Sequence, residues 1–443
     1  MQWAAIRAEV PGLFGLAVPI VVGLAASNLL GVTDSLMLAP LGPVPLAAVG
    51  LTMSIAIILI AAIYGMLSAL SVRIGAAFGA GDQRRIPLLL RNGLALGGLV
   101  GLLGAAVMGT VWFILPLLGQ PPEVLAAMPA YWACISLLMI PFAMLTVFKS
   151  AFEAVGRPWL GTGFAFVAVV VNIPLNYALI WGIGPLPQLG LTGAGVASLL
   201  AEAFALAVAW GWWMRAPGLR RLRLRRPLLR SEMAAAFREG APLGALYVAE
   251  TGAMAVGTLL IGMFGTLALA GNQVAMSVGG LLYMVPLGVA GAVSIRVAQA
   301  KGAGAVETLR PIVWAALVIG LTWLSGSALV LGLFGAEIAR LITSDPGIVA
   351  VAAAIFLVFA ISQIADGVQS TMLGALRGMS DTGWPAGVSI IAYWVVALPL
   401  GWVFAHWLEL GPAGIWLGFV AALFGAAAAL VWRFLARTRP GPA

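Results

Sequence analysis

The chain has 443 residues, of which 62% are hydrophobic and only 9% are charged. Its mean hydropathy of +1.08 leaves too little polar surface to cover a soluble fold of this length, so the composition excludes a soluble globular protein. The net charge of +8 comes from basic residues that gather at the ends of apolar runs, which indicates membrane topology rather than nucleic-acid binding.

Apolar runs of about 20 residues recur along the whole chain, and each is long enough to cross a hydrocarbon core of about 30 Å as a helix. The pattern predicts an all-α polytopic membrane protein. We predict twelve spans, centred near Val22, Ile58, Gly104, Leu138, Val170, Glu202, Ala253, Leu282, Ile319, Phe359, Val395 and Leu423.

The basic residues predict the orientation, because positive charge is retained on the cytoplasmic side of a membrane. Arg7 precedes the first span, Arg73 and Arg91 flank the second connection, and Arg433 follows the last span. Arg340 is the exception to this one-sided distribution. We therefore expect a multi-pass protein of the bacterial cytoplasmic (inner) membrane with both termini in the cytoplasm.

The longest polar stretch is rich in arginine and falls between the sixth and seventh spans. We predict an N-terminal lobe over residues 1–214 (spans 1–6), a cytoplasmic Arg-rich linker over residues 215–238, and a C-terminal lobe over residues 239–443 (spans 7–12). Topology alone explains the arginines of the linker. Contact with anionic inner-leaflet lipid, at about 1 kcal/mol per basic residue, is the alternative.

The two lobes resemble one another at an offset of about 220 residues, which is typical of the internal repeats of transporters. Residues 71–74 read Ser-Val-Arg-Ile and residues 294–297 read Ser-Ile-Arg-Val; residues 194–196 and 413–415 match in the same way. Six spans per repeat is an even number, so the second repeat starts on the same side as the first. The predicted fold is twelve transmembrane helices in two pseudo-symmetric six-helix lobes around a central cavity.

Three carboxylates stand inside the apolar runs: Asp34, Glu250 and Asp366. An Asp at the centre of a span costs roughly 2.5–3.5 kcal/mol on insertion scales, so such a group faces a cavity or a partner and marks an ion pathway. Glu250 and Asp366 belong to one lobe, and two carboxylates in a low-dielectric pocket require a proton or a bound cation to compensate them. We predict that all three bind the coupling cation, with Na⁺ or H⁺ at Glu250 and Asp366. A protonated, purely structural Glu250 is the alternative.

Further polar residues share helix faces inside the spans. Ser362, Asp366 and Gln369 stand at helical spacings of three and four on one face, which contacts a cavity or joins neighbouring helices. Glu202 is a fourth acid in mid-span, and a second proton carrier, a substrate contact and a crevice-facing side chain all stay open for it. The predicted substrate-contacting or accessory polar residues are Asn172, Asn176, Ser362, Gln369, Tyr247, Gln273 and Glu202.

Soluble-type catalytic motifs are absent from the sequence: it has no Walker loop, no His-Glu-x-x-His and no nucleophile elbow. Cys134 and His406 are each the only residue of their kind, so neither an intramolecular disulfide nor a histidine metal site is expected. The sequence therefore predicts neither an enzyme nor a cofactor.

An ordered set of short segments resembles the multidrug and toxic compound extrusion (MATE) family over essentially the whole chain. The segments are Val32-Thr33-Asp34, residues 172–177, Glu250, residues 272–275, residues 294–297, and residues 374–378 followed by Asp381-Thr382. The resemblance implies that Glu250 and Asp366 form the C-lobe cation site of the NorM-like branch and that Asp34 is the N-lobe acid. The DinF-like branch has an aspartate where this chain has Asn176, so the resemblance favours the NorM-like branch. Ser362 stands where some sodium-coupled members place an aromatic residue, which weakens the case for sodium.

The intramembrane acids and the resemblance together predict a secondary active multidrug efflux transporter. It would export amphipathic organic cations in exchange for H⁺ or Na⁺ by alternating access, as a monomer whose partners are cationic or amphipathic drugs, the coupling cation and membrane lipid. A flippase for lipid-linked saccharides of the same superfamily is the alternative, although it would need a basic cavity for pyrophosphate. An intramembrane aspartyl protease using Asp34 or Asp366 is a third hypothesis, and it lacks a matched pair of catalytic motifs.

Overall fold

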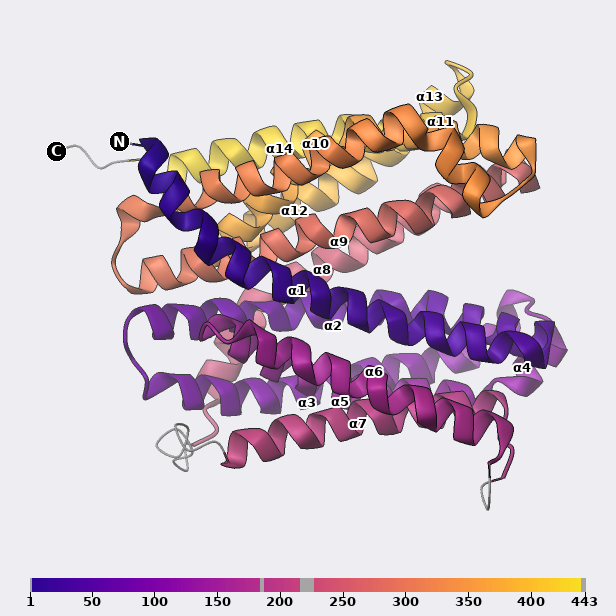
Figure 1. Ribbon diagram of the computed structural model, residues 1–443, viewed down its shortest axis with the longest axis horizontal. Coiled ribbons are helices and arrows are strands. Elements are labelled where there is room, and N and C mark those ends of the chain that lie inside the picture. The colour runs from indigo at the N-terminus through magenta and orange to yellow at the C-terminus, as the bar shows by residue number, and fades with distance from the viewer. Residues whose placement is uncertain (1, 184–186, 216–226, 440–443) are drawn as a thin grey trace. The chain divides into compact units, whose positions relative to one another are not determined.

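The computed structural model describes residues 2–183, 187–215 and 227–439, and within them the chain is almost entirely helical (Figure 1). Twelve helices of these residues are long and apolar enough to cross a membrane. Every predicted span centre lies inside one of the twelve. The all-α polytopic class is therefore confirmed.

The helices of the first half are α1 (Gln2–Leu38), α2 (Pro43–Gly79), α3 (Arg85–Ile114), α4 (Pro122–Ala127), α5 (Pro129–Ala154), α6 (Pro158–Trp181) and α7 (Leu191–Arg215), with short turns η1 (Ala39–Leu41) and η2 (Leu115–Leu118). Those of the second half are α8 (Arg230–Gly262), α9 (Thr266–Gly302), α10 (Leu309–Ile342), α11 (Pro346–Gly378), α12 (Gly383–Ile391), α13 (Leu398–His406) and α14 (Gly411–Arg437), with η4 (Val306–Thr308) and the π-helical turn η5 (Ala392–Ala397).

Proline marks the start of several of these helices. Pro43, Pro129 and Pro158 each occupy the first helical position, where the N–H that proline lacks has no partner within the helix. Asp345 caps α11 as well, because its Oδ1 accepts from the backbone N–H of Gly347 at 2.7 Å. These residues fix helix starts inside a sequence whose apolar composition alone gives few boundaries.

The internal repeat that the sequence predicts is also visible in the backbone dihedral angles. Residues with a left-handed backbone recur 221 to 224 positions apart, at the turns between helices. The pairs are Gly42 (φ 106°) with Gly265 (100°), Gly81 (72°) with Gly304 (77°), Gly156 (74°) with Ser380 (64°), and Gly190 (53°) with Gly411 (56°). Ser380 thus adopts a left-handed conformation that is adopted by a glycine, Gly156, at the equivalent position of the first repeat.

The helices pack into two compact units, and one of them is discontinuous in sequence. The N-unit comprises Val22–Gly244, and the C-unit comprises Met1–Val21 together with Ala245–Ala443. This division differs from the predicted lobes, because the first 21 residues pack with the second half and residues 230–244 of α8 pack with the first. The predicted linker, residues 215–238, overlaps the start of α8, and its residues 216–226 lie outside the described part.

One helix forms the centre of each unit. In the N-unit α5 packs against α2, α3, α6 and α7, and in the C-unit α11 packs against α9, α10 and α14 (Figure 1). Small residues let the helices approach closely. A Cβ at Gly101 of α3 would lie 2.7 Å from Ile140 Cα of α5, and one at Gly374 of α11 would lie 2.3 Å from the carbonyl oxygen of Ala290 in α9.

Ion pairs join the first segments of α1 and α8 to the units in which these segments pack. In the C-unit Arg296 Nη2 lies 2.6 Å from Glu9 Oε2, and in the N-unit Arg73 contacts both Glu232 and Glu239, the latter at 2.8 Å. Glu9 and Glu232 stand 223 positions apart, as do Arg73 and Arg296. The arginine of each repeat is therefore paired with the glutamate of the other, and we call these contacts the reciprocal ion pairs.

Candidate functional site

A ring of four polar side chains lies inside the N-unit. Asp34 comes from α1, Asn172 and Asn176 from α6, and Ser198 from α7. Each is at most 2% exposed. The spacing of four residues places both asparagines on one face of α6, so that this face meets two helices at once. Three helices therefore supply one buried polar cluster, which we call the Asp34 ring.

The hydrogen bonds of the Asp34 ring form a closed circuit. Asn176 Nδ2 donates to Asp34 Oδ1 at 2.5 Å and to Asn172 Oδ1 at 2.9 Å. Asn172 Nδ2 donates to Ser198 Oγ at 3.0 Å, and Ser198 Oγ donates to Asp34 Oδ2 at 2.8 Å. Both oxygens of Asp34 accept, which is the pattern that suits an ionised carboxylate.

Two further buried oxygen atoms lie at the ring. The hydroxyl of Tyr131, on α5, is close enough to Asp34 for the carboxylate charge to act on it. This hydroxyl and Asn176 Oδ1 have no hydrogen-bond partner among the described residues, although buried polar atoms ordinarily have one. Carboxylate, amide and hydroxyl oxygens are the ligand types that hard cations take. The ring therefore offers the chemistry of a small cation or proton site.

A second polar network surrounds Glu250 in the C-unit. Tyr283 Oη of α9 donates to Glu250 Oε1 at 3.3 Å. Gln369 Nε2 of α11 donates to Tyr393 Oη of η5 at 3.3 Å, and Tyr393 in turn lies within hydrogen-bonding reach of Glu250. Since Gln369 donates to the tyrosine oxygen, the phenolic proton of Tyr393 is left for the glutamate. Two tyrosine hydroxyls thus converge on one carboxylate.

Asp366 lies beside this network. It is half-buried on α11, and Glu250 is close enough for the two negative charges to repel. No hydrogen bond joins the two carboxylates within the described part of the chain. The repulsion between two like charges in a low-dielectric site is smallest when a proton or cation neutralises one of them. The structure thus brings together the two acids that the sequence predicts for one lobe.

The remaining predicted residues have separate environments. Tyr247 hydrogen-bonds Arg377 and lies within electrostatic range of Glu250, so it borders the second network. Ser362 Oγ donates to the Phe359 carbonyl of its own helix at 2.8 Å, and the side chain of Gln273 is exposed. Neither of the last two side chains hydrogen-bonds a carboxylate among the described residues.

Sequence reasoning missed several members of both networks. Ser198, Tyr131, Tyr283 and Tyr393 were not predicted as site residues. Tyrosine scarcity is a signal that would have indicated three of them, because the chain has only 6 tyrosines. Four of these, Tyr131, Tyr247, Tyr283 and Tyr393, lie within electrostatic range of Asp34, Glu250 or Asp366.

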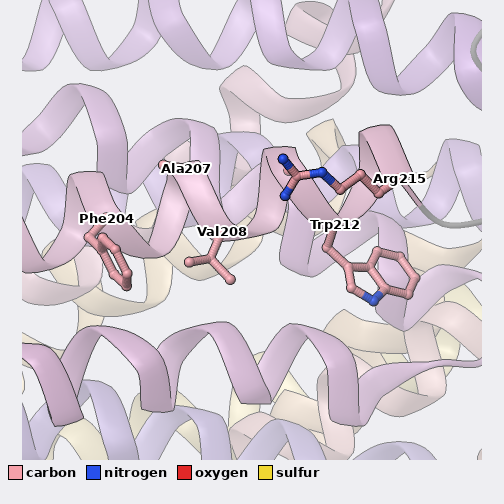
Figure 2. A pocket seen from close by; sticks show the side chains of 6 residues that line it. Phe204, Ala207, Val208, Trp212 and Arg215 are labelled. Carbon is pink, nitrogen blue, oxygen red and sulfur yellow. The ribbon is translucent and has the colours of Figure 1, made fainter.

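A shallow groove of about 610 Å³ lies along α7, on a face other than the one that carries Ser198 (Figure 2). Phe204, Val208 and Trp212 project on one side of the helix, and the side chain of Arg215 extends back along it toward Ala207. Gly211 completes the lining. The lining residues carry no carboxylate and belong to one helix, so this groove is separate from both acid networks.

The MatE family model matches residues 19–178 and 242–403, which is well over half of the chain. The chain belongs to the MATE family. It is 35% identical to the probable multidrug resistance protein NorM of Deinococcus radiodurans, over 98% of this chain and 97% of that protein. It is 32% identical to the multidrug resistance protein PmpM of Pseudomonas aeruginosa, over 98% of this chain and 92% of PmpM.

Solved MATE structures share the fold of this chain. The eukaryotic MATE transporter AtDTX14 superposes with a TM-score of 0.86 at 22% identity, over 97% of this chain and 96% of that one. The bent form of the Vibrio cholerae MATE transporter VcmN gives 0.85 at 23% identity, over 98% of both chains. Membership of this family makes the protein a transporter and not an enzyme. With twelve spans among its described residues and with bacterial relatives, it is a multi-pass protein of the bacterial inner membrane.

Proposed function

We propose that this MATE protein exports amphipathic organic cations in exchange for H⁺ or Na⁺ by alternating access. The observation that carries the proposal is a pair of carboxylate networks, one in each unit: the buried Asp34 ring, and the network around Glu250 and Asp366, which are both half-buried. The names of the relatives, which are multidrug resistance proteins, support the substrate class. The protein acts as a monomer with both termini in the cytoplasm.

In the C-unit the coupling ion relieves repulsion between two acids. An H⁺ or Na⁺ entering from outside neutralises Glu250 or Asp366, and its release toward the cytoplasm restores a site that attracts the next organic cation. Tyr283 and Tyr393 hold Glu250 in place through the cycle, because their hydroxyls donate to the ionised form. Removing the ion therefore leaves an oriented negative charge.

In the N-unit a proton would rearrange the Asp34 ring. Asp34 accepts at both oxygens, from Asn176 and from Ser198. A protonated Asp34 carries a donor at one of them, and this donor would face the donor group of its partner. One of the two bonds must then break or reverse, so proton loading changes the contacts that tie α1 to α6 and α7.

The exchange is driven by the concentration gradient of the coupling ion. When one H⁺ or Na⁺ enters for each monovalent organic cation that leaves, no net charge crosses the membrane, so the membrane potential does no net work on the exchange. Because every 1.4 kcal/mol is a factor of ten in an equilibrium, a tenfold gradient of the coupling ion supports a substrate gradient of about tenfold.

Membrane vesicles test the proposal directly. Glu250→Gln and Asp366→Asn should each abolish ion-driven efflux of a fluorescent organic cation, because each removes a carboxylate from the coupling site. Glu337→Gln is the matched control, since Glu337 is exposed and its one ion pair with another described residue is with Arg340 at 3.2 Å. Undiminished efflux in both site variants would rule out this assignment.

Liposomes given a proton gradient alone or a sodium gradient alone identify the coupling ion. The same liposomes test the alternative function, a flippase for lipid-linked saccharides. Such a flippase needs a basic pocket for pyrophosphate. Both described networks are acidic, which argues against that function. Binding of a lipid pyrophosphate without transport of organic cations would reverse the conclusion.

A further inference from the structure

Three arginines of the C-unit gather where α14 ends. Arg433 Nε lies 2.9 Å and Arg437 Nε lies 3.2 Å from the same atom, Asp381 Oδ2, in the turn between α11 and α12. Arg310, at the start of α10, reaches the same place, because its Nε donates to Thr438 Oγ1 at 3.1 Å. We call Arg310, Asp381, Arg433 and Arg437 the α14-end cluster.

Positive charge exceeds negative charge in the α14-end cluster. Two arginines share one carboxylate oxygen, and Arg310 has no ion pair within 4.0 Å among the described residues, so three arginines against one aspartate leave a surplus of two positive charges. Glu307, three residues before Arg310, is exposed and forms no ion pair with a described residue either. Topology explains basic residues at a span end, but it does not require this surplus, since Arg73 of the reciprocal ion pairs contacts two glutamates.

The cluster lies at the level of the lipid headgroups. α14 has 27 residues, which at 1.5 Å per residue give a length of about 40 Å against about 30 Å for a hydrocarbon core. The last residues of the helix therefore extend out of the core. Beside them Trp432 is 59% exposed, and its ring centroid lies 6.1 Å from that of Trp384 on α12. Tryptophan is typical of this membrane–water boundary.

The contacts of the arginines fix their positions and leave donors exposed. Arg433 Cζ lies over the Trp384 ring, 5.2 Å from its centroid. The side chain of Arg437 is 55% exposed although it pairs with Asp381. A guanidinium has five N–H donors in a planar fork that matches the oxygens of a phosphate, and the contacts above use only some of them. The cluster therefore offers fixed positive donors beside an exposed apolar ring.

We propose that the α14-end cluster binds the headgroup of an anionic phospholipid, with the phosphate at Arg310 and Arg437 and an acyl chain beside Trp432. The phosphate of an anionic lipid offsets part of the surplus charge, whereas a zwitterionic lipid also carries a positive group that the arginines repel. This surface is separate from the predicted Arg-rich linker and from both carboxylate networks. The proposal does not depend on the export function.

Native mass spectrometry of the full-length protein in detergent tests the site, with dioleoyl phosphatidylglycerol and dioleoyl phosphatidylcholine as probes. The readout is the lipid preference, which is the dissociation constant of phosphatidylcholine divided by that of phosphatidylglycerol. Arg310→Gln and Arg437→Gln should each lower the preference about fivefold, because one basic residue near a lipid surface contributes about 1 kcal/mol and 1.4 kcal/mol is a factor of ten.

A change of opposite sign distinguishes binding from a merely structural role. Asp381→Asn should raise the lipid preference, because it removes the carboxylate that competes with the phosphate for two arginines. Loss of local structure would instead weaken the binding of both lipids in all three variants. Arg157→Gln is the matched control and should leave the preference unchanged, because Arg157 is an exposed arginine of the equivalent turn between α5 and α6 and has no ion pair with a described residue.

Four results would overturn the proposal. Equal affinities of the wild type for the two lipids would exclude a headgroup site. A fivefold loss in Arg157→Gln as well would reduce the effect to general surface charge. An unchanged preference in Asp381→Asn would exclude competition for the arginines, and this variant decides the question if the arginine variants do not fold. Displacement of phosphatidylglycerol by an equal concentration of glycerol 3-phosphate would show that a soluble phosphate ester, and not a lipid, is the ligand.

Discussion

Ser198→Ala should destabilise the N-unit far more than the loss of one hydroxyl ordinarily would. Ser198 Oγ has two roles in the Asp34 ring, because it donates to Asp34 Oδ2 at 2.8 Å and accepts from Asn172 Nδ2 at 3.0 Å. Alanine removes both contacts at a position that is 1% exposed, where no room is left for a substitute group. A buried carboxylate oxygen and a buried amide then each lose a partner.

The expected magnitude follows from those two groups. Leaving a buried polar group unsatisfied costs about 1–3 kcal/mol, and a charged group costs more. The free energy of unfolding should therefore fall by about 3–5 kcal/mol. At about 2–4 °C per kcal/mol for a unit of this size, the melting temperature should fall on the order of 10 °C.

Thermal unfolding of the purified protein in detergent, followed by tryptophan fluorescence, measures this change. Ser136→Ala is the matched control, because Ser136 is also buried in the N-unit, and its one hydrogen bond within the described part of the chain is from Oγ to the Trp132 carbonyl of its own helix. That bond is worth about 1 kcal/mol. Equal melting temperatures for the two variants would show that the ring does not hold α1, α6 and α7 together.

Three further predictions concern the C-unit. Ser380→Gly should raise the free energy of unfolding by about 0.5–1 kcal/mol, because it relieves a left-handed backbone at φ 64°; a lower melting temperature would contradict this. Gly418→Ala should abolish the yield of folded protein, since its Cβ would lie 2.2 Å from Gly401 N, whereas Gly425→Ala, with nothing within 4 Å, should be neutral in the same expression assay. Tyr393→Phe should slow ion-driven efflux several-fold at normal yield, because it removes a hydroxyl within reach of Glu250; an unchanged rate would exclude that role.

Spans and acids were predictable from the sequence because their signals are local. A membrane helix must contain about 20 apolar residues in a row, so hydropathy alone places its centre. A carboxylate inside such a run is anomalous wherever it stands, which is how Asp34, Glu250 and Asp366 were found. The spacing of Asn172 and Asn176 likewise needs only one helix.

The rest could not be predicted because it depends on contacts between distant segments. Ser198 resembles any helix serine until α1 and α6 deliver Asp34 and Asn172 to it. The shared face of the tenth span predicted a contact for Ser362, but its hydroxyl bonds the carbonyl of its own helix, which serine readily does. The exchange of helix starts has no local signal at all, because α1 and α8 run without interruption from one unit into the other.

The reciprocal ion pairs impose an order on the assembly of the two units during synthesis. Arg73 leaves the ribosome well before Glu232, and Glu9 well before Arg296, so neither reciprocal pair can close until synthesis has entered the second repeat. The first 21 residues wait longest for their partners. Either repeat expressed as a separate polypeptide would therefore lack a helix segment that its partner supplies, and only the two halves made together would complete both units.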